Sequence, residues 1–224
     1  MNCVKSRQTI EEIIKKSRFI GVIVPCANEN EVLLNLKQLY DEHPNASHIA
    51  YAYRTKTDHG LVYRLHDAGE PTGTAGKPIF QHIEGKELIN LLIAVIRYFG
   101  GVKLGAGGLT RAYGNTTKQV IEAAEIGAYV ELVNIRLTLD YKQMQPLEYL
   151  LKKLGGQIIK QEFTGQVQLI IQLPAKQVNT LLQSFPGTPD YLPASTEIRQ
   201  FNHEKHESHK NFKELLIPWR SPCG

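Results

Sequence analysis

The sequence predicts a two-domain α+β protein with a boundary near residue 128. A length of 224 residues fits one large domain or two small ones, and 42% hydrophobic residues suffice for a substantial core. A long helical pattern ends near Gly127, where a new series of elements starts. From there the order of expected elements is βαββαβ, the split pattern of a ferredoxin-like domain. We therefore divide the chain into 1–128, 129–201 and a polar tail at 202–224.

The first domain is expected to combine strands and helices. Asn28 can cap a helix because Glu31 follows three residues later. The run 88–99 is apolar nearly throughout, which is typical of a strand buried on both faces. Residues 5–17 fit a strand or a short helix. The other expected elements are strands at 18–25, 47–54 and 61–65, and helices at 28–43, 79–87 and 109–126.

The second domain and the tail complete the prediction. Its expected elements are strands at 129–141, 157–163, 167–173 and 191–201, and helices at 144–154 and 175–185. The tail is polar and basic, and we expect it to be mobile or loosely docked. His203, His206 and His209 are spaced to share one helix face. They would either bind a metal or belong to a solvated segment, and we favour the second interpretation.

Five glycines lie within nine residues, between the apolar run and the helix that follows: Gly100, Gly101, Gly105, Gly107 and Gly108. Such glycines allow a ligand to approach the main chain, and a helix N-terminus attracts anions. Arg97, Lys103 and Arg111 surround them, and no acidic residue occurs between Glu87 and Glu122. We expect phosphate or RNA backbone to bind here. The alternative is a connection that needs glycine only for tight packing.

Two common phosphate motifs do not fit this glycine-rich stretch. A dinucleotide fingerprint would need glycine where Thr110 stands, and a P-loop would need lysine where Ala106 stands.

Several tyrosines flank the basic residues, and they either stack on bases or belong to the core. These are Tyr51, Tyr53, Tyr63, Tyr98 and Tyr113.

The segment 67–78 is rich in glycine and proline and predicts a structured loop. A carboxylate pair beside a histidine supports acid–base chemistry or metal binding, whereas carboxylates in such loops also cap turns or pair with a cation such as Arg97. No nucleophile elbow or metal-ligand spacing accompanies them. We therefore expect no catalytic residue, metal or cofactor, and assign six residues to the shaping of a cleft: His48, Arg54, Asp67, Glu70, Thr72 and Lys77.

Composition narrows the class of protein. The net charge is only +4 and there is no polybasic arm. Cys3, Cys26 and Cys223 are widely spaced, so they indicate neither a disulfide framework nor a zinc site. The first twenty residues lack a signal-peptide core, and the most apolar run is shorter than the roughly 20 residues that span a bilayer. We expect a cytoplasmic protein without a membrane partner.

Three stretches together closely resemble the IMPACT/YigZ family over roughly 15–128. They are His48 with Tyr53-Arg54, DAGEPTGTAGKP at 67–78, and RYFGGVKLGAGGLTRAY at 97–113. The second domain is similar to the small C-terminal domain of the bacterial members. The resemblance implies a ribosomal-protein-like N-terminal fold shared with translocase domain IV, followed by a ferredoxin-like domain similar to translocase domain V. It also implies a link to translational control, since eukaryotic members compete for an activator of the amino-acid-starvation kinase.

Three functions remain open at this point. The leading hypothesis is a non-catalytic translation regulator that binds RNA or the ribosome through the glycine-rich basic loop. A second is an enzyme acting on a nucleotide or phosphorylated small molecule between loops 67–78 and 97–111, by analogy with a small-molecule kinase superfamily of related fold. A third is a protein-binding regulator of a stress-response translation factor.

Overall fold

The computed structural model describes residues 1–57, 59–163, 165–185 and 190–192. Contacts divide the chain into a first unit, Met1–Tyr129, and a second unit that begins at Val130. The expected last strand beyond Leu192 and the tail at 202–224, with His203, His206 and His209, lie outside the described residues. The two units are described separately below.

The first unit is built on a five-stranded antiparallel sheet with the order β2-β3-β6-β4-β5. Its strands are β2 (Gln8–Ile14), β3 (Ser17–Pro25), β4 (His48–Thr57), β5 (Gly60–His66) and β6 (Leu91–Tyr98). Strand β6 is central, and all residues from Leu91 to Arg97 are buried. The apolar run at 88–99 thus predicts this strand, because a strand covered on both faces has no polar side, although β6 begins at Leu91 and ends at Tyr98.

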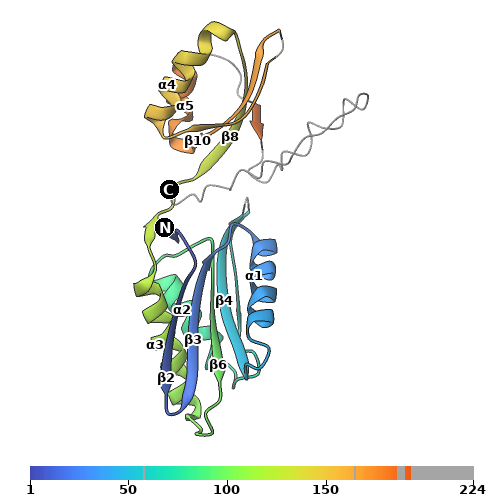
Figure 1. Cartoon of the computed structure of the whole chain (residues 1–224). Helices are drawn as coiled ribbons and strands as arrows, with labels where there is room; N and C mark the ends of the chain where they lie inside the picture. Colours follow the sequence, from blue (N-terminus) through green and yellow to red (C-terminus); the bar gives the residue numbers. More distant parts are fainter. Residues whose placement is uncertain (58, 164, 186–189, 193–224) are drawn as a thin grey trace, which may run out of the picture. The chain divides into compact units, whose positions relative to one another are not determined.

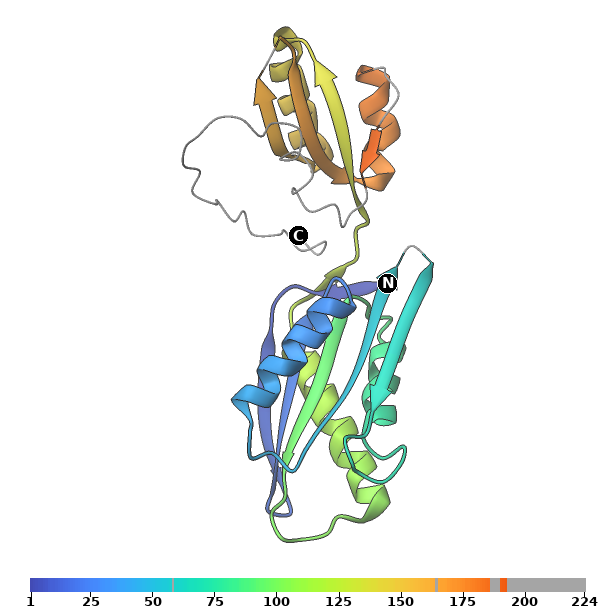
Figure 2. The same cartoon turned by 90° about the vertical axis from the view of Figure 1, so that its right-hand side faces the viewer.

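Helices cover both faces of this sheet (Figures 1 and 2). Helix α1 (Glu29–Glu42) packs on one face through Val32, Leu36 and Leu39. Helices α2 (Gly76–Gly85) and α3 (Gly105–Ala123) pack on the other face through side chains that include Ile79, Ile83, Tyr113 and Val120. The result is three layers with two apolar cores, one on each side of β6.

The start of α1 confirms the predicted cap. The Asn28 side chain accepts a hydrogen bond from the Glu31 amide at 3.0 Å, and the Glu31 carboxylate accepts one from the Ala27 amide at 2.8 Å. Two amides that have no partner inside the helix are thereby satisfied.

Several predicted boundaries in this unit are wrong. Helix α3 begins at Gly105 rather than 109, so the second half of the glycine-rich stretch is helical. It ends at Ala123, and Gly127 lies instead in β7 (Ile126–Ala128), which pairs with β1 (Asn2–Val4). Helix α2 takes in the last residues of the 67–78 segment. Local glycine preferences mislead here because helix propensity is only a weak guide to where a helix begins and ends.

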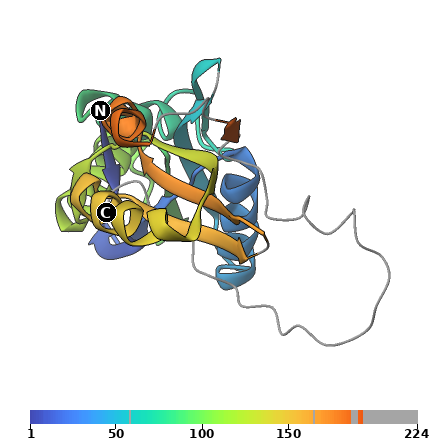
Figure 3. The same ribbon diagram turned by 90° about the horizontal axis from the view of Figure 1, so that it is seen from above.

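The second unit has the predicted βαββαβ order. Its elements are β8 (Leu132–Leu139), α4 (Met144–Leu154), β9 (Gln157–Phe163), β10 (Val167–Pro174), α5 (Val178–Ser184) and β11 (Asp190–Leu192), with 3-10 turns at Tyr141–Gln143 and Ala175–Gln177. The antiparallel sheet has the order β11-β8-β10-β9. Both helices lie on one of its faces (Figures 1 and 3).

Alternation along β10 explains the core of this unit. Val167, Leu169, Ile171 and Leu173 are buried, and they pack with apolar residues of α4 and α5 that include Leu147, Leu151 and Leu181. The opposite face carries amide side chains, where Gln172 bonds to both Gln157 at 3.1 Å and Asn134 at 3.2 Å. No helix within the described ranges has the length and hydropathy needed to cross a membrane.

Separate cores predict separate responses to core mutations. Ile93→Ala in β6 and Ile171→Ala in β10 each remove a fully buried side chain, so each should lower the free energy of unfolding of its own unit by about 2–5 kcal/mol. Hydrogen exchange measured by peptide mass spectrometry should rise in the mutated unit alone. Ile13→Ala, at a residue that is 74% exposed, is the control and should change little. Equal increases in both units would contradict the separation.

Candidate functional site

Asp67 organises the loop that connects β5 to α2. Its carboxylate accepts hydrogen bonds from the amides of Gly73 at 2.9 Å, Ala75 at 3.0 Å and Gly76 at 2.8 Å. Burial alone would raise the pKa of the Asp67 carboxyl, but the three amide donors outweigh it and the pKa is lowered. The side chain therefore stays ionised and fixes the loop at the start of the helix.

Glu70, on the same loop, forms a buried ion pair with Arg97 of β6. Arg97 Nη1 donates to Glu70 Oε1 at 2.7 Å, and the two side chains are 6% and 4% exposed. The Tyr113 hydroxyl of α3 donates to the same oxygen at 2.8 Å. Burial and the nearby carboxylate raise the pKa of Tyr113, which keeps this hydroxyl protonated. The pairing of a loop carboxylate with Arg97, one of the two sequence interpretations, is confirmed.

The guanidinium of Arg97 is enclosed on its other sides as well. Its centre lies 5.5 Å from the centroid of the Phe19 ring and 5.4 Å from that of Phe99. Arg97 Nη2 is 3.5 Å from the Ser17 hydroxyl, and Nε has no hydrogen-bond partner within the described part of the chain. Arg97 therefore holds the 67–78 loop against β6, and a direct contact of this residue with phosphate remains an untested prediction.

His48 lies at the edge of the buried pair. Its Nδ1 is 2.8 Å from the Ala68 carbonyl oxygen, and since a carbonyl only accepts, Nδ1 carries a proton. Its Nε2 lies 3.8 Å from Glu70 Oε1, and the His48 side chain is 26% exposed. In the neutral form Nε2 can accept a proton, and in the charged form it adds a second cation beside Glu70.

The remaining residues assigned to the cleft are dispersed. Thr72 and Lys77 are exposed on the loop and at the start of α2. Arg54 faces Leu91 across the sheet, whereas His48 faces Arg97. Six residues of strand correspond to about 20 Å, so the structure does not bring Arg54 to the loop.

The first half of the glycine-rich stretch packs against the turn between β2 and β3. A side chain at Gly100 would place its Cβ 1.9 Å from the Lys16 carbonyl oxygen, so only glycine fits there. The Gly100 amide donates to the Ser17 hydroxyl at 3.2 Å. Gly101 follows with φ +84°, a conformation that disfavours other residues. The path of the loop therefore depends on Gly100 and Gly101 for packing and backbone conformation.

The second half of the stretch opens α3. Gly105, Gly107 and Gly108 all lie at the N-terminal end of the helix. No side chain of the described residues caps this end, and its first turn contains no acidic residue. A helix N-terminus with this composition carries partial positive charge and amides directed outward, which favours an anion.

Exposed cations gather at this end of the first unit. Lys103 and Arg111 are exposed, as the sequence analysis requires of binding residues. Because Gly100 packs on Lys16, the structure adds Lys15 and Lys16, both exposed in the β2–β3 turn. Figures 1 and 2 show this turn beside the loop that leads into α3. We call Lys15, Lys16, Lys103 and Arg111 together the basic end.

Lys15 and Lys16 were missed by the sequence analysis, which considered only cations near the glycines. The available signal was an adjacent lysine pair directly before a strand, and this pair does not reveal its distant neighbour. Both residues have positive φ, 45° for Lys15 and 69° for Lys16. Such a backbone is confined to a tight turn, so the two side chains are held at its tip.

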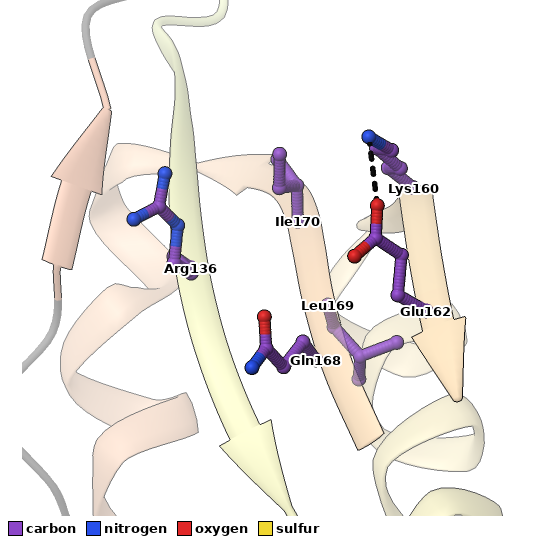
Figure 4. Close-up of a pocket in the computed structure, with 6 residues that line it drawn as sticks. All are labelled: Arg136, Lys160, Glu162, Gln168, Leu169 and Ile170. Carbon is purple, nitrogen blue, oxygen red and sulfur yellow. Dashed lines mark ion pairs between the residues drawn. The ribbon is translucent and has the colours of Figure 1, made fainter. Parts of the chain in front are cut away.

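The second unit offers a shallow depression on the open face of its sheet (Figure 4). It is lined by Arg136, Lys160, Glu162, Gln168, Leu169 and Ile170. Lys160 and Glu162 form an ion pair at 3.0 Å, so charges of both signs meet there. Across the described ranges, no group of three or more His, Cys, Asp and Glu residues is arranged to hold a metal ion. The basic end of the first unit is therefore the better candidate site.

Comparison with known proteins agrees with the resemblance seen in the motifs. The Impact N-terminal domain family matches residues 15–121, and a domain of unknown function, DUF1949, matches residues 137–185. The Escherichia coli protein "IMPACT family member YigZ" is 33% identical over 171 residues, which cover 76% of this chain and 84% of that protein. The chain belongs to the IMPACT family. A Haemophilus influenzae "IMPACT family member" is 36% identical over 78% of this chain and 85% of its own length.

Solved structures add support for the fold of this IMPACT family member. A crystal structure of a hypothetical protein superposes with a TM-score of 0.60 and 30% identity, covering 88% of this chain and 98% of that one. The two-domain translational regulator Yih1 matches with a TM-score of only 0.32 and 19% identity over 54% of this chain and 46% of its own. That second likeness is too weak to carry an argument.

Loss of the Glu70 charge should destabilise the first unit strongly. Glu70→Gln leaves the buried Arg97 guanidinium without its counter-ion, which typically costs about 3–5 kcal/mol of unfolding free energy. Denaturant unfolding measures this loss. Adding Arg97→Met should recover part of it, because no buried charge then remains. The control is Glu11→Gln, which breaks an exposed ion pair with Arg18 and should leave the unfolding midpoint nearly unchanged. Equal effects of the two single substitutions would contradict the structural role.

Asp67 should make the stability of the first unit depend on acid pH. Because its pKa is lowered in the folded state, its contribution is present above the unfolded value of about 3.9 and is lost as pH falls through the folded value. Unfolding free energy measured between neutral pH and about pH 3 should fall less steeply in Asp67→Asn than in the wild type. Asp41→Asn, at an exposed position on α1, should retain the wild-type profile. Identical profiles for Asp67→Asn and the wild type would be inconsistent with this assignment.

Proposed function

We propose that this IMPACT family member is a non-catalytic, translation-associated regulator that binds the phosphate backbone of RNA or of the ribosome through the basic end. The observation that carries this proposal is the grouping of exposed cations around an uncapped helix N-terminus. Lys15, Lys16, Lys103 and Arg111 supply full charges, and the first turn of α3 supplies amides. Phosphate contacts of this kind provide affinity without base recognition.

Charge distribution supports this proposal. No carboxylate occurs from residue 88 to 121, so the glycine loop and nearly all of α3 contain no acidic residue. The nearby Glu11 is occupied by Arg18, which donates to it at 2.7 Å. A surface with cations and few free carboxylates attracts polyanions even though the whole chain carries only +4.

The buried pair supports the proposal indirectly. Arg97 and Glu70 neutralise one another beneath the loop, and Tyr113 ties them to α3. This arrangement fixes the ends of the glycine loop before any ligand arrives. A preformed site loses little conformational entropy on binding. Arg97 is thus a positioning residue in this proposal, and Lys103 and Arg111 contact the phosphates.

The fold implied by the sequence resemblance also favours a role in translation. The sequence resemblance implies a ribosomal-protein-like first domain of the translocase-domain-IV type and a ferredoxin-like second domain. The βαββαβ order and the β11-β8-β10-β9 sheet of the second unit are compatible with the latter. Fold analogy is weaker support than the charges, because one fold serves many functions.

RNA binding should depend steeply on salt, and the dependence should report the proposed contacts. Removing two phosphate contacts with Lys103→Ala and Arg111→Ala should reduce the slope of log affinity against log salt by about 1.4 for a single strand. Fluorescence anisotropy with a labelled RNA oligonucleotide measures the slope. Lys118→Ala is the matched control, since Lys118 lies on the same helix but pairs with Glu122 at 3.8 Å.

Two results would decide against the proposal. One is the absence of RNA or ribosome binding by the full chain at low salt. The other is an equal reduction of the slope by Lys118→Ala and by either substitution at the basic end. The first result would rule out the proposed function. The second would show that the contact surface lies elsewhere on α3.

An enzymatic function is the second candidate, and His48 is the observation that favours it. With Nδ1 bound to the Ala68 carbonyl, Nε2 is directed to within 3.8 Å of Glu70, and the His48 side chain is 26% exposed. A histidine held in this way can exchange a proton with a phosphorylated small molecule or a nucleotide. A rise in melting temperature with one nucleotide, abolished by His48→Asn, would favour this function over RNA binding.

A protein-binding function is the third candidate, and the edge strand β5 favours it. All its residues are exposed, including Leu61, Val62, Tyr63 and Leu65. An exposed apolar edge can pair with an extended segment of another protein. A pull-down that survives nuclease treatment and is weakened by Val62→Lys would support a protein partner.

A further inference from the structure

An exposed aromatic ring lies at the basic end. Phe99 directly follows β6 and is 49% exposed, although it is a large apolar residue. The guanidinium of Arg97 lies over its ring at 5.4 Å from the centroid, on the side of the sheet where Arg97 meets Tyr113 and Glu70. The ring therefore stands on the same side of the sheet as α3, immediately before the glycine loop.

The backbone around Phe99 is fixed on both sides. The Phe99 amide donates to the Ser47 hydroxyl at 3.0 Å, and the next amide, of Gly100, donates to the Ser17 hydroxyl at 3.2 Å. The cation over the ring is itself held by Glu70 at 2.7 Å. An exposed ring with so little freedom pays a small entropic cost when another flat group stacks on it.

The tyrosines considered from sequence are engaged elsewhere. Tyr53 and Tyr113 are buried in the two cores. Tyr51 stacks on His66, and Tyr63 stacks on Phe80. The Tyr98 hydroxyl bonds to His43 at 2.9 Å, and its ring receives the Arg18 guanidinium. Phe99 is exposed and directly precedes the glycine loop that carries Lys103.

We infer that Phe99 is a stacking platform for an unpaired base, so that the RNA taken by the basic end is single-stranded. This inference rests on the proposed function and specifies its ligand. Single-strand binding sites combine cations that follow the backbone with aromatic rings on which bases stack, and both are present here. In a duplex the base faces already stack on one another and are not available to a protein ring.

The inference is tested with two RNA probes of equal length and charge, a uridine oligonucleotide and its abasic counterpart. The full-length wild type should bind the uridine probe roughly 5- to 150-fold more tightly, the range expected for one stacked base. Phe99→Leu should abolish this preference and leave the salt slope unchanged, because no phosphate contact is removed. Phe99→Trp should retain or increase the preference, which separates stacking from a structural role of the ring.

Tyr149→Leu is the matched control, since Tyr149 is an exposed aromatic residue on α4 and should not affect either probe. Equal binding of both probes by the wild type would overturn the inference. So would an equal loss by Phe99→Leu on both probes, because the ring would then act on the fold or the backbone contacts. In these cases salt-dependent binding would still support the proposed function. Absence of binding to either probe at low salt would instead contradict the proposed function itself.

Discussion

The buried ion pair between Arg97 and Glu70 determines the arrangement of this end of the molecule. Two charges removed from water are tolerated only when each is well satisfied, so their neighbours have little freedom. Glu70 meets this requirement with Arg97 and the Tyr113 hydroxyl, which come from β6 and α3. The 67–78 loop, the central strand and the long helix are thus joined at one carboxylate oxygen.

The position of the exposed residues follows from this buried arrangement. Once β6 is fixed through Arg97, Phe99 and Gly100 leave the sheet at a defined place. Gly100 has no side chain, and this allows the main chain at Lys16 to approach closely. Residues some 85 positions apart in the sequence then share one surface, and the proposed RNA contacts of the loop and of the β2–β3 turn depend on the same packing.

The sequence predicted the elements that follow from a local pattern, but not the features that depend on a contact between distant residues. Strand β6 and the Asn28 cap follow from composition and spacing, and α4 and β9 have the bounds expected from periodicity. The start of α3 at Gly105 departs from the low helix propensity of glycine, which is only a weak guide to where a helix begins. Arg97 was assigned from sequence to phosphate binding and was also named as a cation that a loop carboxylate could pair with, since the sequence does not show which carboxylate an arginine will meet. The contribution of Lys15 and Lys16 to the basic end depends on the contact between Gly100 and Lys16, which no local sequence pattern reveals.

Because Arg97 lies in the interior, fewer of the cations between residues 88 and 121 are available to a ligand than the sequence suggests. Four cations and no carboxylate occur between residues 88 and 121, and three of these cations, Arg97, Lys103 and Arg111, were assigned from sequence to the binding surface. The positive charge of Arg97 is neutralised by Glu70, so it contributes little to the electrostatic field outside the protein. The β2–β3 turn supplies two further lysines in its place, so the outward charge is carried by exposed side chains alone. Charge that is free to meet a polyanion is therefore separated from charge that holds the scaffold, so the exposed cations can be substituted without breaking the buried pair.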